Sequence, residues 1–255
     1  MNLLAFELST EACSVALWVD GDVRERHEIA PRRHAEFALP WAEALLAEAG
    51  IAKSQLDAIA VGRGPGAFTG VRLGVAVAQG IALALDRPAV PVSTLAALAM
   101  RALHSSPPPP HAGEGWGGGD GTHVLAAIDA RMNEVYVAGY RLTLEHGELR
   151  PIPTGAEQVL APDAVPLPDD GGAWFGVGTG FAALGGVLQA RLPSDWRAVD
   201  AEALPHAADV VRLAHAALLR GEAVAPELLE PAYLRNQVAL TLVEQQALRA
   251  ARSQS

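Results

Sequence analysis

The sequence has very little cysteine and lysine, with one of each among its 255 residues. Cys13 cannot form an intramolecular disulfide, and without a Cys-x-x-Cys pair a cysteine-based zinc site is excluded. Cys13 lies in a predicted strand, where a small buried apolar residue is expected. Lys53 follows the end of a predicted helix and belongs to a surface turn. Schiff-base chemistry and a Walker lysine are therefore excluded.

The histidines lack the spacing of a helical metal site, which needs two histidines four positions apart. His34 opens a predicted helix, but no histidine follows one turn later. We expect surface or capping roles for His104, His206 and His215. The sequence therefore predicts no metal site.

Membrane and nucleic-acid signals are also scarce. No basic leader precedes the first predicted strand, and the most apolar helix, at residues 71–85, carries Arg72 and Gln79. That helix is too short to span a bilayer comfortably, so we expect a cytoplasmic protein without a membrane partner. The net charge of −10 and the pI of about 5.2 repel phosphates. Nucleic acid is expected to be reached only with a partner that supplies a basic surface.

Apolar residues are plentiful: they make up 50% of the chain, and its mean hydropathy is +0.18, which is enough for a substantial core. Two segments repeat one pattern, in which an apolar run ends in an acid, turns tightly and continues as a second apolar run. The first acid is Glu7 and the second is Asp129. A phosphate-facing β-hairpin is built in this way. The repetition predicts an α/β fold with two lobes of duplicated ββαβ type and a cleft between them.

The predicted domains are a first lobe at residues 1–104 with partner-binding helices, a low-complexity Pro/Gly insertion at 105–121, a second lobe at 122–235 and a helical tail at 236–255. The predicted strands of the first lobe are 3–7, 14–20, 23–30, 56–62 and 89–92. Its predicted helices are 34–49, 70–85 and a third that Ser93 or Thr94 caps and that ends at 103. The second lobe is expected to contain strands at 124–129, 134–140 and 173–177 and helices at 181–192 and 207–220.

A glycine-rich segment at residues 62–74 follows a predicted strand and opens a helix. Glycine allows backbone turns closed to other residues, and free amides at a helix start attract anions. The segment matches neither the Walker A nor the Gly-x-Gly-x-x-Gly pattern. Phosphate binding and close packing of the turn both stay open.

The two hairpin acids also allow two interpretations. They can hold a magnesium-bound phosphate between the lobes, or they can cap their own turns. No second acid or histidine at fixed spacing marks a general base, so no catalytic residue is assigned. The candidate cofactor-binding residues are Glu7, Gly64, Gly66 and Asp129.

The predicted helices at 34–49 and 70–85 are apolar on more than one face, although a helix on a sheet has to bury only one. A central core position explains this for one helix. Two such helices on one lobe favour an interface with helices of a partner. The candidate interface residues are His34, Phe37, Trp41, Leu45, Phe68, Val71, Arg72, Val75 and Ala78.

Five segments in this order resemble the TsaB family, also called YeaZ: residues 10–17, Arg33-His34, 64–74, 129–136 and 231–235. The resemblance runs from the first strand to about Arg235 and leaves out the insertion. It implies an actin-like/Hsp70-like ATPase (ASKHA) fold. It also implies a non-catalytic scaffold subunit, required for N6-threonylcarbamoylation of adenosine 37 in tRNAs that read ANN codons.

The same resemblance implies the partners. The chain is expected to bind the catalytic paralogue TsaD, which carries the His-x-x-x-His site, through its first-lobe helices, and to help recruit the ATPase TsaE. Alone it is expected to form a homodimer, and it reaches tRNA only through the complex. It requires no cofactor of its own, while a nucleotide at a partner interface stays open.

The chain departs from the family at the first hairpin, where the usual Asp-Thr reads Glu7-Leu8. This departure argues against independent nucleotide hydrolysis. The alternative function is that of an active enzyme of the same fold, either an ATPase or kinase or a metallopeptidase.

Overall fold

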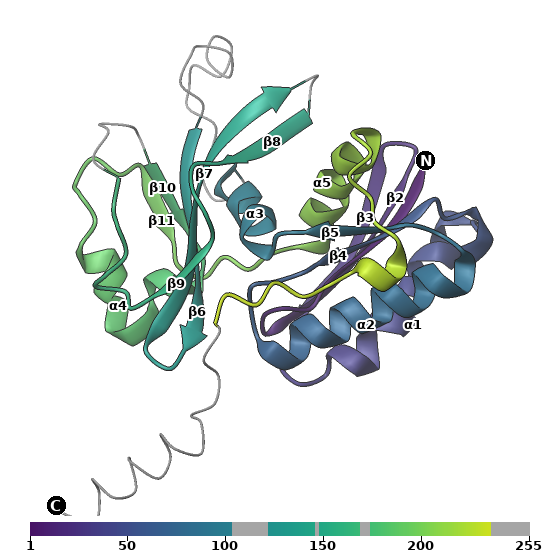
Figure 1. Ribbon diagram of the computed structural model, residues 1–255, viewed down its shortest axis with the longest axis horizontal. Helices are drawn as coiled ribbons and strands as arrows, with labels where there is room; N and C mark the ends of the chain where they lie inside the picture. Colours follow the sequence, from purple (N-terminus) through teal and green to yellow (C-terminus); the bar gives the residue numbers. More distant parts are fainter. Residues whose placement is uncertain (104–121, 146–147, 169–173, 236–255) are drawn as a thin grey trace, which may run out of the picture.

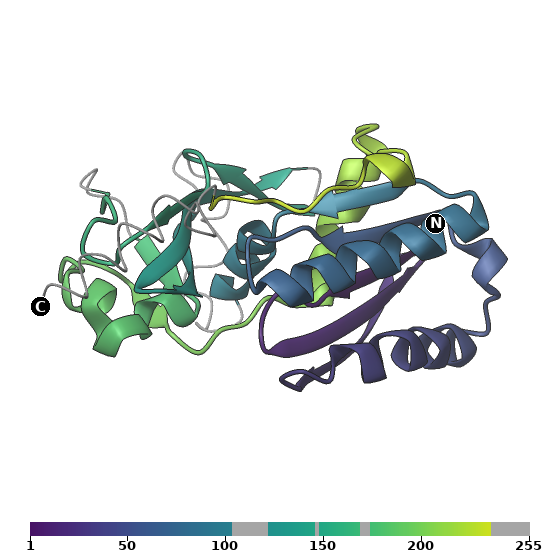
Figure 2. The ribbon, with the colours of Figure 1, turned by 60° about the horizontal axis from the view of Figure 1, so that its bottom comes forward.

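The computed structural model describes residues 1–103, 122–145, 148–168 and 174–235 (Figure 1). These residues form two mixed β-sheets with helices packed on them, which confirms the predicted two-lobed α/β architecture. Figure 2 shows the two lobes side by side. The predicted insertion at 105–121 and the predicted helical tail at 236–255 lie outside the described residues.

The first sheet has five strands in the order β3-β2-β1-β4-β5. β1 pairs antiparallel with β2 and parallel with β4. The strands are β1 (Asn2–Glu7), β2 (Ala12–Val19), β3 (Asp22–Ile29), β4 (Ala58–Gly62) and β5 (Ala89–Val92).

The two faces of this sheet are both covered by helices, because successive side chains of a strand point to opposite faces. Leu4 and Phe6 of β1 pack in the cluster formed with α1 (His34–Ala49) and α2 (Phe68–Leu85). Leu3 and Ala5 pack on the other face against α5 (Ala207–Leu219), as Figure 1 shows. All four side chains are at most 1% exposed, so β1 is the centre of the lobe.

The second sheet follows the order β11-β10-β6-β7-β8, and β9 also pairs with β7. β6 pairs antiparallel with β7 and parallel with β10. The strands are β6 (Thr122–Arg131), β7 (Glu134–Glu145), β8 (Glu148–Pro153), β9 (Gln158–Leu160), β10 (Trp174–Val177) and β11 (Ala198–Asp200). Its helices are α3 (Thr94–Ala99) on one face and α4 (Ala183–Ala190) on the other.

The two sheets have the same pairing pattern, strand for strand, and the fifth strand of each leads into a helix that packs on the other sheet. β5 leads to α3, whose Leu95 and Leu98 belong to the core of the second sheet. β11 leads to α5, whose Val210 and Ala214 belong to the core of the first sheet. The chain is thus duplicated with an exchange of helices.

This exchange corrects the predicted domain boundaries. A first lobe that ends at residue 104 would include α3, which packs on the second sheet instead. A second lobe at 122–235 would include α5, which covers the first sheet. Sequence order suggested consecutive lobes, but the apolar faces of these helices are buried by the opposite sheet.

Helix boundaries follow local chemistry where the signals are strong. α1 spans the predicted residues, runs through Pro40 and ends at Gly50, whose φ of 69° is left-handed. α3 is capped by the Ser93 hydroxyl, which accepts from the Ala96 amide. Short 3-10 turns follow or precede helices elsewhere (Lys53–Gln55, Met100–Leu103, Thr179–Phe181 and Pro226–Leu228).

Two helix predictions are corrected. The predicted helix at 181–192 is mostly irregular at its start, because Leu184, Gly185 and Gly186 have φ between 52° and 84°. Glycine adopts such angles without a steric cost, so the two glycines favour a left-handed turn over a helix.

α2 begins at Phe68, which makes it 18 residues long and, by length and composition alone, the one described helix that could cross a membrane. Its buried residues line one face against β4, and core helices pass the same test.

The segment between β4 and α2 packs with its backbone directly on the β1–β2 turn. A Cβ added at Gly66 would lie 2.3 Å from the carbonyl oxygen of Ser9, and one at Gly70 would lie 2.0 Å from that of Leu8. The Ala67 amide donates to the Ser9 carbonyl oxygen at 2.7 Å. The glycines therefore serve close packing, one of the two roles that the sequence allowed.

We predict that Gly70→Ala lowers the free energy of unfolding by about 3 kcal/mol, because backbone atoms around the new methyl cannot move aside. Gly80→Ala on the same helix is the matched control, since nothing lies within 4 Å of its added Cβ. That control should raise stability by up to about 1 kcal/mol through helix propensity. Urea unfolding measures both, and equal effects of the two changes would contradict the packing argument.

Candidate functional site

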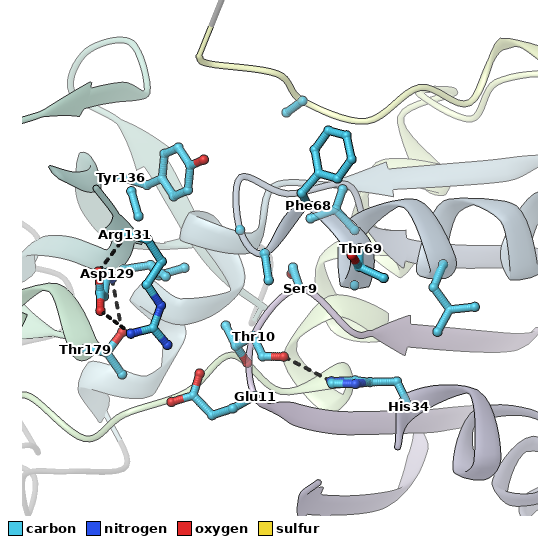
Figure 3. Close-up of a pocket in the computed structure, with 18 of the residues that line it drawn as sticks. Ser9, Thr10, Glu11, His34, Phe68, Thr69, Asp129, Arg131, Tyr136 and Thr179 are labelled. Carbon is cyan, nitrogen blue, oxygen red and sulfur yellow. Dashed lines mark hydrogen bonds and ion pairs between the residues drawn. The ribbon is translucent and has the colours of Figure 1, made fainter. Parts of the chain in front are cut away.

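A cleft of about 1080 Å³ lies between the two sheets. It is lined by the β1–β2 turn, the starts of α1 and α2, the β6–β7 turn, Thr179 and residues 232–235. Figure 3 shows Ser9, Phe68 and Thr69 on the first-lobe side, with Asp129 and Arg131 across from them. The cleft therefore lies where the duplicated hairpins predict it.

The acid of the first hairpin is turned into the protein instead of the cleft. Glu7 is 1% exposed and does not line the cleft. Its Oε1 accepts from the Ser9 amide at 2.8 Å and from the Ser9 hydroxyl, and its Oε2 accepts from the Thr94 hydroxyl at 3.0 Å. Burial raises the pKa of the Glu7 carboxyl, although the hydrogen bonds from Ser9 and Thr94 oppose this.

The acid of the second hairpin also holds its own turn. Asp129 Oδ1 accepts from the Arg131 amide at 2.8 Å, and its Oδ2 accepts from the Arg131 guanidinium at 3.0 Å. The turn residues Arg131, Met132 and Asn133 have φ between 54° and 65°, which the carboxylate cap helps to fix. Of the two interpretations of these acids, the geometry favours turn caps over magnesium ligands.

The four candidate cofactor-binding residues are thus separated by the fold. Gly66 and Asp129 line the cleft, whereas Glu7 and Gly64 do not. Gly64 has a φ of 93° and faces the Val71 side chain, so its role is conformational. The family pattern alone could not show which of these residues line the cleft. It marks the first hairpin but does not indicate which way the side chain of Glu7 points.

Charged groups of both signs line the opening of the cleft, and the acids among them are Glu11 and Asp129. Arg32, Arg131 and Arg235 line it, and the side chain of Arg131 is 82% exposed. Among the described residues, α1 and α2 both begin here without a side-chain cap on their first amides. Helix starts and arginines attract anions, although Arg131 and Arg235 are already paired with Asp129 and Glu134. Sequence reasoning missed Arg32 and Arg131 as cleft residues, although Arg131 lies inside one segment of the family pattern and Arg32 directly precedes another.

A strap formed by residues 231–235 joins the two sides of the cleft, and Figure 1 shows it crossing between the lobes. On the first-lobe side, the Ala232 amide donates to the Arg63 carbonyl oxygen at 2.8 Å, and Arg72 Nε donates to the Tyr233 hydroxyl at 2.7 Å. On the second-lobe side, Arg235 forms an ion pair with Glu134. The strap gives a structural role to residues 231–235, the last of the five segments in which the sequence resembles the family.

The nine candidate interface residues fall into two groups. Five are buried in the protein itself and are corrected here: His34, Leu45, Val71, Val75 and Ala78, each at most 9% exposed. The helices bury them against the first sheet, so they offer no surface to a partner. The other four keep some exposure: Phe37 and Trp41 are half-buried, and Phe68 and Arg72 are exposed.

His34 has a specific structural role in place of a docking one. Its Nε2 lies 3.0 Å from the Thr10 carbonyl oxygen and 3.1 Å from that of Ala12, so the ring nitrogen donates to the turn. Figure 3 shows the bond to Thr10. His34 therefore ties the start of α1 to the β1–β2 turn.

Outside the cleft, one group of three side chains in the described ranges could hold a metal ion. Glu25, His27 and His206 place one ligand atom each within 4.8 Å of the others. The sequence contained no signal for this group, because β3 and α5 meet only through the exchange of helices.

The chain is similar to known proteins in both sequence and structure. A family model described as TsaD, tRNA N6-adenosine threonylcarbamoyltransferase, matches residues 27–241. The chain is 40% identical to the tRNA threonylcarbamoyladenosine biosynthesis protein TsaB of Escherichia coli (strain K12), over 94% of this chain and 96% of that protein. It is also 40% identical to the TsaB protein of Haemophilus influenzae, over 93% and 95%.

A solved structure described as YeaZ from Pseudomonas aeruginosa is similar with a TM-score of 0.78 and 47% identity. The alignment covers 91% of this chain and 99% of that one. A second structure with the same TM-score is described as an uncharacterized protein with similarity to peptidase YEAZ from Pseudomonas aeruginosa.

We predict that Glu7→Gln gains stability relative to the wild type as pH rises. Because folding raises the pKa of Glu7 above 4.5, the protonated group gives its full stability below that pH. This stability is lost as pH rises through the folded pKa, and glutamine has no such loss. The difference in stability between Glu7→Gln and the wild type is measured from urea midpoints between pH 4 and pH 8, which is about the range in which a buried carboxyl titrates.

The control for this prediction is Glu28→Gln, which changes an exposed acid of β3. Its difference from the wild type should vary little over the same range. A Glu7→Gln curve parallel to that of the wild type would show that burial of Glu7 carries no ionisation cost.

Proposed function

The chain belongs to the TsaB family, and on that premise we propose that it is a non-catalytic scaffold subunit for tRNA threonylcarbamoylation. The reaction is N6-threonylcarbamoylation of adenosine 37 in tRNAs that read ANN codons. In this proposal the chain binds a TsaD-like catalytic paralogue, helps recruit a TsaE-like ATPase, meets tRNA only through the complex and acts in the cytoplasm.

Family membership also confirms the predicted fold class, the two-lobed actin-like/Hsp70-like ATPase fold. Relatives named for threonylcarbamoyladenosine biosynthesis cover nearly the whole chain. Their naming supports the same pathway for this protein, and the family model of a threonylcarbamoyltransferase supports a partner of that kind.

The observation that carries the docking proposal is the apolar surface left on α1 and α2. Phe37 and Trp41 of α1, with Leu73 and Val77 of α2, pack on the core cluster but stay partly exposed. The Phe37 and Trp41 rings stack at 4.8 Å. Such half-buried aromatic side chains are typical of interface centres.

The outer side of α2 adds a route for a close helix contact. Ala76 and Gly80 are exposed small residues, and Leu83 nearby is 55% exposed. Small side chains let a second helix approach, while the leucine offers apolar area to bury. The same surface would join two copies of the chain when no paralogue is present, which is our proposal for a homodimer.

A scaffold role also accords with the state of the hairpin acids. Glu7 accepts hydrogen bonds from Ser9 in its own turn and from Thr94 of α3, and Asp129 accepts from Arg131 in its own turn, so neither carboxylate is held ready for a phosphate-bound metal. A phosphate-transferring enzyme of this fold needs such a group. A nucleotide at a partner interface remains compatible with the arginines and the two helix starts at the opening of the cleft.

The direct test is reconstitution of the modified tRNA from the catalytic paralogue and the ATPase of the same organism, with and without this chain. We expect threonylcarbamoyladenosine only when the chain is present. ATP turnover or peptide-bond hydrolysis by the isolated chain would instead favour the rival, an ATPase, a kinase or a metallopeptidase.

We predict that Leu83→Arg weakens binding to the catalytic paralogue about tenfold or more, because a charge would be buried in an apolar contact. Leu219→Arg is the matched control, since Leu219 is 64% exposed on α5, which covers the opposite face of the sheet. Calorimetry measures both dissociation constants.

Val75, although a candidate interface residue from the sequence, is unsuited to this test, because its side chain is 6% exposed within the core. A charge there would unfold the helix from the sheet and could not separate docking from folding. Equal binding by the Leu83 and Leu219 variants would place the interface elsewhere.

A further inference from the structure

Three side chains from distant parts of the sequence meet on the face of the first sheet that α5 covers. Glu25 and His27 are two positions apart on the edge strand β3, so both side chains point to the same face. His206 directly precedes α5, where the chain returns from the second sheet. Their candidate ligand atoms all lie within 4.8 Å of one another.

We propose that Glu25, His27 and His206 form a binding site for a divalent transition metal, with Zn²⁺ as its ion. Two imidazole nitrogens and one carboxylate oxygen are the ligand set that suits zinc, whereas calcium and magnesium prefer sites built from oxygen alone. Water completes the tetrahedron. The site fixes the crossing of the chain between the lobes and takes no part in the reaction of the complex.

One nitrogen of this group lacks a partner. His27 Nδ1 is buried and accepts or donates no hydrogen bond among the described residues. A buried polar atom without a partner costs free energy, so most such atoms in proteins are satisfied. A metal ion at this position supplies the missing interaction.

The carboxylate is already oriented for a ligand. Glu25 Oε1 accepts from the Ser14 hydroxyl at 2.7 Å and from the Ala208 amide at 3.0 Å. Oε2 is left to His206, whose Nδ1 lies 2.9 Å away. Hydrogen bonds that hold the outer oxygen of a ligating carboxylate are the usual support of a metal site.

The required movement is a side-chain rotation. The His27 and His206 rings are stacked with their centroids 3.8 Å apart and an angle of 4° between their planes, so their nitrogen lone pairs lie in parallel planes and do not converge on one ion. Tetrahedral zinc needs donor atoms about 3.3 Å apart with lone pairs that converge. Coordination of one ion therefore requires one of the two rings to leave the stack by rotation about its last side-chain torsion, which is a soft torsion.

Charge around the group does not prevent binding. Arg101 is the nearby cation, since it acts on the titration of His27. It pairs at 3.4 Å with the buried Asp209, whose other oxygen pairs with Arg212 at 3.0 Å, so the repulsion of a metal ion is only partly offset. The Glu25 carboxylate supplies the negative charge next to the ligands.

The test uses the full, untagged chain after treatment with EDTA. Zn²⁺ is titrated by calorimetry, and Co²⁺ by visible absorption, in which tetrahedral coordination gives strong bands. We expect one Zn²⁺ per chain and a rise in the melting temperature with Zn²⁺ concentration. His27→Ala and His206→Ala should each weaken binding about tenfold or more.

His215→Ala is the matched control, because His215 also lies on α5 and contacts a glutamate, Glu148, but belongs to no group of three candidate metal ligands among the described residues. It should bind Zn²⁺ as the wild type does. His27→Ala decides the outcome, since it keeps the Glu25–His206 bond that positions the start of α5. Unchanged Zn²⁺ affinity in His27→Ala, or equal loss in His215→Ala, would show an adventitious ion only and overturn the proposal.

Discussion

The fold depends on a contact of backbone with backbone, where the β1–β2 turn lies against the glycine-rich segment before α2. The Ala67 amide bonds to the Ser9 carbonyl oxygen, and no side chain fits between Gly70 and Leu8. This contact fixes where α2 begins and therefore which of its faces is buried on the sheet. His34 holds the start of α1 to the same turn. One turn thus positions both helices and the first-lobe wall of the cleft.

The same close approach determines what the cleft can do. With Gly62 pressed on it, the Glu7 carboxylate is confined to a pocket made by Ser9 and Thr94. A buried carboxylate whose two oxygens already accept hydrogen bonds from the protein is poorly placed to hold a metal-bound phosphate. The partly exposed apolar surface of α1 and α2 remains, and such a surface agrees with a docking role.

The two halves of the chain exchange helices, and this exchange holds the two lobes together. α3 and α5 each complete the core of the sheet that their own half of the chain did not build. The strap at residues 231–235 adds polar bonds to both lobes. The exchange also brings together residues that no sequence pattern connects. The clearest case is the meeting of His206 with Glu25 and His27.

The sequence by itself determined the elements with strong local chemistry. Gly50 indicated the end of α1, Ser93 indicated the cap of α3, and two apolar runs that end in acids predicted the hairpins. These signals can be read from the sequence because caps, turns and strand periodicity act over a few residues. It also indicated the family through motifs of fixed spacing. Only the tertiary structure decided which way Glu7 points, that Val75 and Leu45 are core residues, and that α3 and α5 change lobes. Those outcomes depend on contacts between residues far apart in the chain, and local patterns carry no information on which surface buries a given apolar face.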